Sequence, residues 1–110
     1  MAGIEDPNVI DLVAQDANGE YMVVMVETRP WGVSCEQPDQ LKQKINAYVG
    51  YILDGDLARQ YPEAAEKPVR IQLNCAHTPR GEIATITEWA ARQLSQHGIG
   101  FAVTAKDQAT

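Results

Sequence analysis

The fold of this chain is decided by residues 9–27, which read VIDLVAQDANGEYMVVMVE. Two β-prone runs flank the turn DANG at residues 16–19. Asn18 and Gly19 adopt a positive φ at little cost, so the turn fits a two-residue type I′ loop or a three-residue loop with glycine in the left-handed position. The stretch therefore predicts a β-hairpin, with its register open between these two loops. No catalytic or cofactor motif stands out elsewhere, so the sequence alone identifies no function.

The composition is that of an ordinary globular protein, with 110 residues of which 45% are hydrophobic and 22% charged. We expect one domain with an ordered core at about residues 5–105, because a chain of this length buries a core without disulfides or metals. The net charge of −6 leaves no basic stripe for a phosphate backbone. The basic residues are scattered, and we interpret Lys42 and Lys44, on one expected helix, as solvated. Nucleic acid is therefore not an expected partner.

The first residues, MAGIEDPNV, lack the basic and apolar regions of a secretory leader. No run approaches the ~18 apolar residues of a membrane span. These features predict a cytoplasmic protein with no membrane partner. The two cysteines, Cys35 and Cys75, are too few for a disulfide framework and are expected to be reduced.

A helix is expected after a loop at residues 28–38, where Ser34 and Gln37 could form a capping box. Its apolar positions recur at helical spacing. They are Leu41, Ile45, Tyr48, Val49 and Ile52. Gly55 should end this helix, and Asp56 should cap a short second helix that Pro62 stops. Residues 63–68 are expected to be a connector.

The second half of the chain predicts a strand, a helix and a strand. Residues 69–75 alternate between apolar and polar side chains, as in a strand with one buried face. A helix should follow from about Glu82 to Gln96 and end at Gly98. Its inner stripe is expected to be Ile83, Ile86, Ala90 and Leu94. A last strand should contain residues 99–103, and the tail at 106–110 should fray.

The resulting order is β-β-α-β-α-β, which predicts an α/β (α+β) two-layer domain with a mixed four-stranded sheet. The hairpin supplies an antiparallel pair, and the helix between the last two strands implies a parallel pair with a right-handed crossover. The polar outer face of residues 69–75 indicates that the helices cover one face of the sheet only.

Several segments resemble an uncharacterised bacterial family, the family of domain of unknown function 6572. The segments are EDPNVIDL at residues 5–12, NAY at 46–48, YPE at 61–63 and KPV at 67–69. The resemblance spans most of residues 5–75. It implies no activity, cofactor or site residue.

The strongest catalytic candidate is Cys75 with His77, because residues two apart on a strand point to the same side and this strand ends here. Open α/β sheets often bind ligands at that edge, where an imidazole could activate a thiol. Against this, Cys75 continues an apolar series and fits a small core residue. Together with Cys35 and His97 the pair would supply zinc-type ligands, but at no recognised spacing, so neither a metal nor a cofactor is expected.

Two other groups of residues suggest binding. Glu5, Asp6 and Asp11 form an acidic cluster, which we interpret as strand flanks and not as a cation site. Trp31 and Trp89 are candidates for a ligand pocket or an interface, with partial core burial as the alternative for each.

The second strand indicates a partner, because both of its faces are apolar. Tyr21, Val23 and Met25 lie on one face, and the other carries Met22, Val24 and Val26. One of these sets must face away from the helices. We expect a homodimer that joins the open faces of two sheets, with coverage by the N-terminal segment as the alternative.

These observations favour a small cytoplasmic binding or association module, homo-oligomeric and not an enzyme. The alternative is a hydrolase or transferase that uses Cys75 and His77. The burial of Cys75 distinguishes the two hypotheses, since a catalytic thiol must be open to a cleft.

Overall fold

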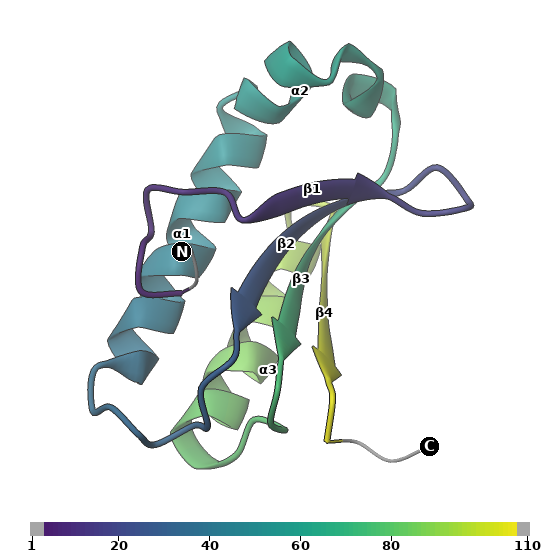
Figure 1. Cartoon of the computed structure of the whole chain (residues 1–110). Coiled ribbons are helices and arrows are strands. Elements are labelled where there is room, and N and C mark those ends of the chain that lie inside the picture. Colours follow the sequence, from purple (N-terminus) through teal and green to yellow (C-terminus); the bar gives the residue numbers. More distant parts are fainter. Residues whose placement is uncertain (1–3, 108–110) are drawn as a thin grey trace.

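A computed structural model describes residues 4–107 and shows two layers, a four-stranded sheet and helices packed on one of its faces (Figure 1). The strands are β1 (Leu12–Gln15), β2 (Tyr21–Glu27), β3 (Val69–Cys75) and β4 (Ile99–Ala105). The helices are α1 (Gln37–Leu53), α2 (Asp56–Gln60) and α3 (Gly81–Ser95), with a 3₁₀ helix at Pro62–Glu66. The element order and the mixed sheet confirm the predicted fold.

The hairpin forms with the longer of the two expected loops. Asp16 N–H donates to the Glu20 carbonyl at 3.0 Å, which leaves three residues in the loop, and Gly19 takes the left-handed position with a φ of 88°. The Asp16 carboxylate also accepts hydrogen bonds from the amides of Asn18 and Glu20. β1 begins only at Leu12, later than the predicted run, because residues 9–11 turn away to contact α1.

The strands are ordered β1-β2-β3-β4, so neighbours in the sequence are neighbours in the sheet. β1 pairs antiparallel with β2, and β2, β3 and β4 run parallel. The odd-numbered side chains of the sheet face the helices, as predicted for β3, and this settles the choice between the two faces of β2 that the sequence left open. Those that are buried are Tyr21, Val23, Met25, Ile71, Leu73, Cys75, Ile99 and Ala105. The predicted inner stripe of α3 is buried against them, which confirms that element.

Two local predictions in the helical connections are wrong. Ser34 and Gln37 form no capping box, because Glu36 precedes the helix and Ser34 Oγ accepts from its amide. Gly55, and not Asp56, precedes α2. The connector expected after Pro62 contains a 3₁₀ helix that buries Ala64. The end groups of these helices are bonded to residues two to four positions away in the chain.

Lys44 is buried and not solvated as predicted. Its ammonium donates to the carbonyl oxygens of Asp6 and Val9, each at 2.6 Å, and to Asp11 Oδ1 at 3.0 Å. Its side chain is 0% exposed. A charged lysine side chain is stable in the core only when its charge and each of its N–H donors have a partner. Of the acidic residues near the N-terminus, Asp11 thus binds Lys44 with its carboxylate, and Asp6 binds it only with its backbone carbonyl.

The N-terminal segment also closes the free edge of β2. Asp11 Oδ2 accepts a hydrogen bond from Val26 N–H at 3.0 Å, two residues past the pairing of Val24 with Leu12, where β1 begins. The Tyr48 hydroxyl donates to the Val24 carbonyl at 2.7 Å and accepts from the Asp11 amide at 2.9 Å. Lys44 and Tyr48 of α1 therefore attach the start of the chain to the sheet.

Candidate functional site

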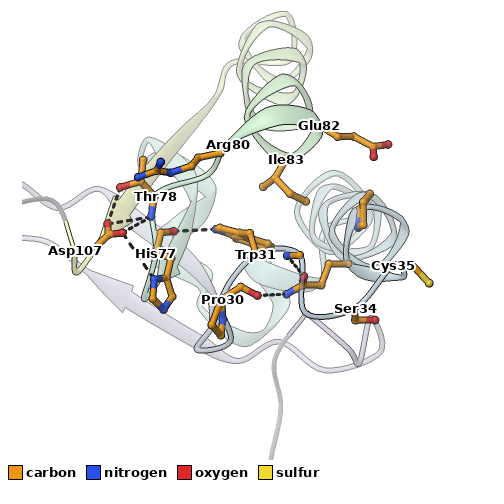
Figure 2. A pocket seen from close by; sticks show the side chains of 13 residues that line it. Pro30, Trp31, Ser34, Cys35, His77, Thr78, Arg80, Glu82, Ile83 and Asp107 are labelled. Atoms are coloured by element: carbon orange, nitrogen blue, oxygen red, sulfur yellow. Dashed lines mark hydrogen bonds and ion pairs between the residues drawn. The ribbon is translucent and has the colours of Figure 1, made fainter.

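A pocket of about 610 Å³ lies at the edge of the sheet where β2, β3 and β4 all end (Figure 2). Parallel strands carry their carboxyl ends to the same edge, which is where open α/β sheets commonly bind ligands. Its walls are the loop from β2 to α1, the loop from β3 to α3 and Asp107, the second residue after β4. Polar and aromatic lining residues are Trp31, Ser34, Cys35, His77, Arg80 and Asp107.

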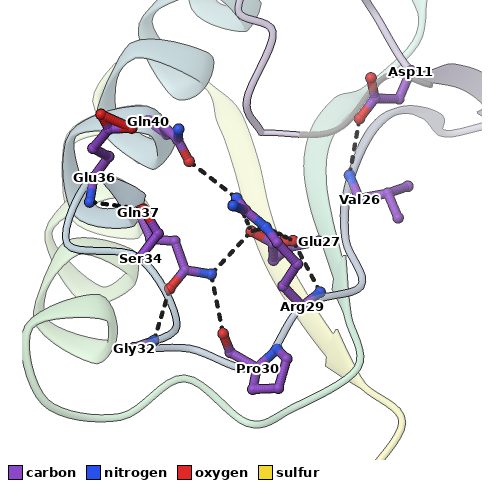
Figure 3. A network of polar contacts seen from close by, with 10 residues as sticks. All are labelled: Asp11, Val26, Glu27, Arg29, Pro30, Gly32, Ser34, Glu36, Gln37 and Gln40. Carbon is purple, nitrogen blue, oxygen red and sulfur yellow. Dashed lines mark hydrogen bonds and ion pairs between the residues drawn. The ribbon is translucent and has the colours of Figure 1, made fainter.

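The wall from β2 to α1 is held in place by a buried polar network around Glu27 (Figure 3). Arg29 donates to the Glu27 carboxylate from its backbone amide, Nε and Nη2, and Gln37 Nε2 donates to it at 3.2 Å. Gln37 also contacts the Pro30 carbonyl and the Gly32 amide. The network gives an irregular loop a defined shape, because each of its buried polar groups has a partner.

Trp31 connects the two long loops. Its indole N–H donates to the His77 carbonyl at 2.8 Å, and its ring packs partly against the core. Figure 2 shows the ring between the two walls, near the middle of the pocket. Trp31 therefore lines the pocket and is half-buried, and its role in binding a ligand stays a prediction.

The charged side chains of the pocket differ in whether they already have hydrogen-bond partners. Asp107 accepts from the Thr78 amide and, at 2.6 Å, from the Thr78 hydroxyl, and these bonds hold the pKa of its carboxyl below the ordinary value. His77 Nδ1 lies 3.8 Å from the same carboxylate. Within residues 4–107 the exposed Arg80 guanidinium has no hydrogen bond or ion pair. Arg80 is thus the cation available to a ligand.

Cys75 and His77 do not form a catalytic pair in this structure. Cys75 is 3% exposed on the helix-facing side of β3, and its thiol donates to the Thr104 carbonyl at 3.7 Å. Burial raises the pKa of this thiol to about 11, which suppresses the thiolate at neutral pH. The His77 ring lies beyond the end of the strand, beside Asp107. The burial of Cys75 disfavours the hydrolase or transferase hypothesis.

The two thiols should differ strongly in reactivity. We expect the exposed Cys35 to react at least about tenfold faster with a disulfide reagent at pH 8 than the buried Cys75, whose raised pKa leaves little thiolate. The single variants Cys35→Ser and Cys75→Ser assign each rate. Rapid labelling of Cys75 that His77→Ala slows would instead indicate an activated pair.

The remaining zinc-type ligands are not brought together. Cys35 is on the pocket wall, whereas His97 follows α3 at the opposite end of the sheet, near the start of β4. Within the described part of the chain no three His, Cys, Asp or Glu side chains are placed to hold a metal ion.

The open face of the sheet is less exposed than its sequence suggested. Val24, which lies between Leu12 and Gln72 in the sheet, is 3% exposed. Arg70 lies over Met22, donates to its sulfur and pairs with Asp16 and Glu20. Met22 and Val26 are half-buried. Among the described residues of the N-terminal segment, Asp11 bonds to the edge of β2 at Val26. The homodimer through the open face stays a prediction.

Trp89 lies away from the pocket. It is 45% exposed in a groove of about 520 Å³ between α1 and α3, flanked by Lys42 and Arg92. Trp31 and Trp89 therefore belong to two separate surfaces.

Sequence reasoning missed Arg80, Gln37 and Asp107. Each of these residues follows a strand or begins a helix at the carboxyl edge of the sheet. Their positions just after predicted strands, or at the start of predicted helices, could have indicated them from the sequence. Their convergence depends on the strand order, which the sequence left open.

The fold and the pocket define a small α+β domain with a cleft at the carboxyl edge of a mixed sheet. The chain belongs to a family of unknown function, DUF6572, whose model matches residues 2–107. This confirms the resemblance and extends it beyond Cys75. No curated protein and no solved structure matches the chain. Membership assigns no activity.

Between residues 4 and 107, no helix is both long and apolar enough to cross a membrane. The cytoplasmic location and the bacterial origin expected from the sequence stay predictions.

Proposed function

We propose that this chain is a binding module that takes a small molecule with a flat apolar part and an anionic group in the pocket at the carboxyl edge. The observation that carries the proposal is the convergence, in one cavity, of Trp31 and the unpaired Arg80. An aromatic face binds flat apolar groups, and a guanidinium forms charge-assisted hydrogen bonds with carboxylates and phosphates.

The surroundings of Arg80 support an anionic ligand. The first turns of α1 and α3 both border the pocket, and helix N-termini carry partial positive charge and unpaired amides. The two acids of the lining do not cancel this preference. Asp107 is engaged by Thr78, and Glu82 lies exposed at the rim, where solvent screens its charge.

Fluorescence of Trp31 tests this proposal. The chain has two tryptophans, so Trp89→Phe leaves Trp31 as the only reporter. Phenyl phosphate and benzoate at millimolar concentration should change its emission saturably, whereas benzylamine and benzyl alcohol should not.

Arg80→Gln should weaken binding of phenyl phosphate by about tenfold or more, since one charge-assisted hydrogen bond contributes roughly 1.5–3 kcal/mol. The matched control is Arg92→Gln, in the groove between the helices, which should bind like the parent. An absent response to both anions, or equal affinity in Arg80→Gln and the parent, would contradict the proposal.

Self-association is the second proposal for this chain. It rests on an observation at a different surface, the outer edge of β4, and not on the open face of the sheet.

A further inference from the structure

The outer edge of β4 presents unpaired backbone groups. β4 is the last strand of the sheet and pairs on one side only, with β3. Lys106 N–H donates to the Cys75 carbonyl at 3.0 Å, so even-numbered residues of this strand turn their backbone toward β3. By strand alternation, the N–H and C=O groups of the odd-numbered residues point outward. These residues are Ile99, Phe101, Val103 and Ala105.

The opposite edge of the sheet is protected. β1 has only four residues, and at its first residue the side chains of Asp11 and Tyr48 bond to the Val26 amide and the Val24 carbonyl. Short edge strands and side chains that satisfy the backbone are devices by which proteins prevent edge-to-edge pairing.

β4 has none of these devices. It spans seven residues, Ile99–Ala105, without a proline or a charged side chain. Within residues 4–107, no side chain bonds to the outward backbone groups of Phe101 or Val103. A long uncharged edge of this kind is a template for another strand.

We propose that two copies of this chain pair along β4, antiparallel and centred on Ala102, to form one continuous sheet twice as wide. In this register Phe101 lies opposite Val103 of the second copy, and Ile99 lies opposite Ala105. All four are residues with outward backbone groups, so the pairing is self-complementary under a twofold axis. This inference goes beyond the pocket and does not depend on its ligand.

The side chains fit the same register. Ala102 meets Ala102 of the second copy in a closely spaced pair without hydrogen bonds, where small side chains are easily accommodated. Phe101 with Val103 is an aromatic and β-branched pair, which stabilises neighbouring antiparallel strands.

The charges at the ends of the strand are also complementary. The register sets His97 opposite Asp107 of the second copy, and Lys106 opposite Gly98. No like charges face each other along the paired strands, so nothing electrostatic opposes the register.

The helical layer permits this arrangement. A twofold axis perpendicular to the sheet keeps the helices of both copies on one face and brings the two α3 helices side by side. One flank of α3, with Trp89 and Arg92, borders α1. The flank turned away from α1 carries the small residues Ala84, Thr87 and Ala91, which allow helices to approach closely.

Sedimentation equilibrium tests the proposal with paired charge variants. The wild-type chain should sediment as a dimer of twice 12.1 kDa. Ala102→Glu and Ala102→Lys should each be monomeric, because each places like charges across the twofold axis, with an expected weakening of about tenfold or more. A mixture of the two variants in equal amounts should restore the dimer. Circular dichroism like that of the wild type verifies that both fold.

Leu12→Glu is the control, because Leu12 is 52% exposed on the open face, three strands away from β4. It should leave the dimer intact. A dimer that Leu12→Glu dissociates and the Ala102 variants retain would overturn the proposal in favour of pairing through the open face. A wild-type monomer at all accessible concentrations would also overturn it.

Hydrogen exchange supplies a second readout. The amides of Phe101 and Val103 should become more protected as protein concentration rises, while the amides of Ala102 and Thr104, already paired with β3, should not change. Exchange of Phe101 and Val103 that does not depend on concentration would contradict the β4 pairing.

Discussion

Lys44→Met should lower the free energy of unfolding by about 3–5 kcal/mol, the range typical of removing one partner of a buried ion pair. Methionine keeps most of the volume of the side chain but removes the ammonium. The Asp11 carboxylate, whose side chain is 6% exposed, then loses its cation. The carbonyls of Asp6 and Val9 lose their donor. Chemical denaturation of the variant and the parent measures the difference.

Lys42→Met is the matched control, since Lys42 is exposed on the same helix and its replacement should change stability by less than about 0.5 kcal/mol. Adding Asp11→Asn to Lys44→Met should recover part of the loss, because the amide oxygen still accepts from Val26 N–H and no buried charge remains. Equal stability of Lys44→Met and Lys42→Met would show that the burial of Lys44 is wrong.

Arg29→Met should destabilise the fold by about 2 kcal/mol at pH 7, less than a fully buried pair because the side chain of Arg29 is 28% exposed. Burial alone would raise the pKa of the Glu27 carboxyl, but hydrogen bonds from Arg29 and Gln37 outweigh it and hold this pKa below its ordinary value. Without Arg29, a nearly buried carboxylate keeps only the amide of Gln37 as a side-chain partner.

The effect of Arg29→Met should depend on pH in a defined direction. A carboxyl group with a lowered pKa in the folded state stabilises the protein above its unfolded pKa of about 4.3, and this contribution is lost as the pH falls through the folded value. The variant should therefore approach the parent in stability near pH 3. Arg59→Met, in an exposed pair with Asp56, is the control and should change little at either pH. A loss of unfolding free energy in Arg29→Met that is the same at pH 7 and pH 3 would contradict an ionic role for Arg29.

The helices and strands that could be predicted are those whose own sequence pattern gives one apolar face. Alternation at residues 69–75 and helical spacing in residues 83–94 give a buried face whatever the neighbours are, and both faces are buried as predicted. The turn around Gly19 admitted two loops, and the choice between them came from the hydrogen bond that pairs Asp16 with Glu20.

The interior polar residues could not be predicted in the same way. Lys44 was interpreted as solvated because lysine is rarely buried, and nothing near it in the sequence neutralises its charge. Its partners Asp6, Val9 and Asp11 come from more than 30 residues away. Gln37 is a similar case, since its partner Glu27 lies on another element.

The residues of the candidate site also divide into those that the sequence indicated and those that only the structure revealed. Trp31, Cys75 and His77 were singled out by residue type and by their place near a strand end. The structure separates Cys75 from His77, because the last inward position of β3 puts the thiol in the core while the loop turns the imidazole toward Asp107. Arg80 and Asp107 line the same pocket as Trp31 because β2, β3 and β4 are adjacent and parallel, so that the segments after them meet at one edge of the sheet.

The sequence by itself determined the element order, the buried faces of β3 and α3 and the family, since periodicity and turn chemistry act over a few residues and need no partner from elsewhere in the chain. Tertiary structure alone decided the order of the strands, the buried contacts of Lys44 and Glu27, the pocket around Trp31 and Arg80, and the free edge of β4. These features arise from groups far apart in the chain, and the burial that makes their charges and hydrogen bonds strong exists only when the whole domain has closed.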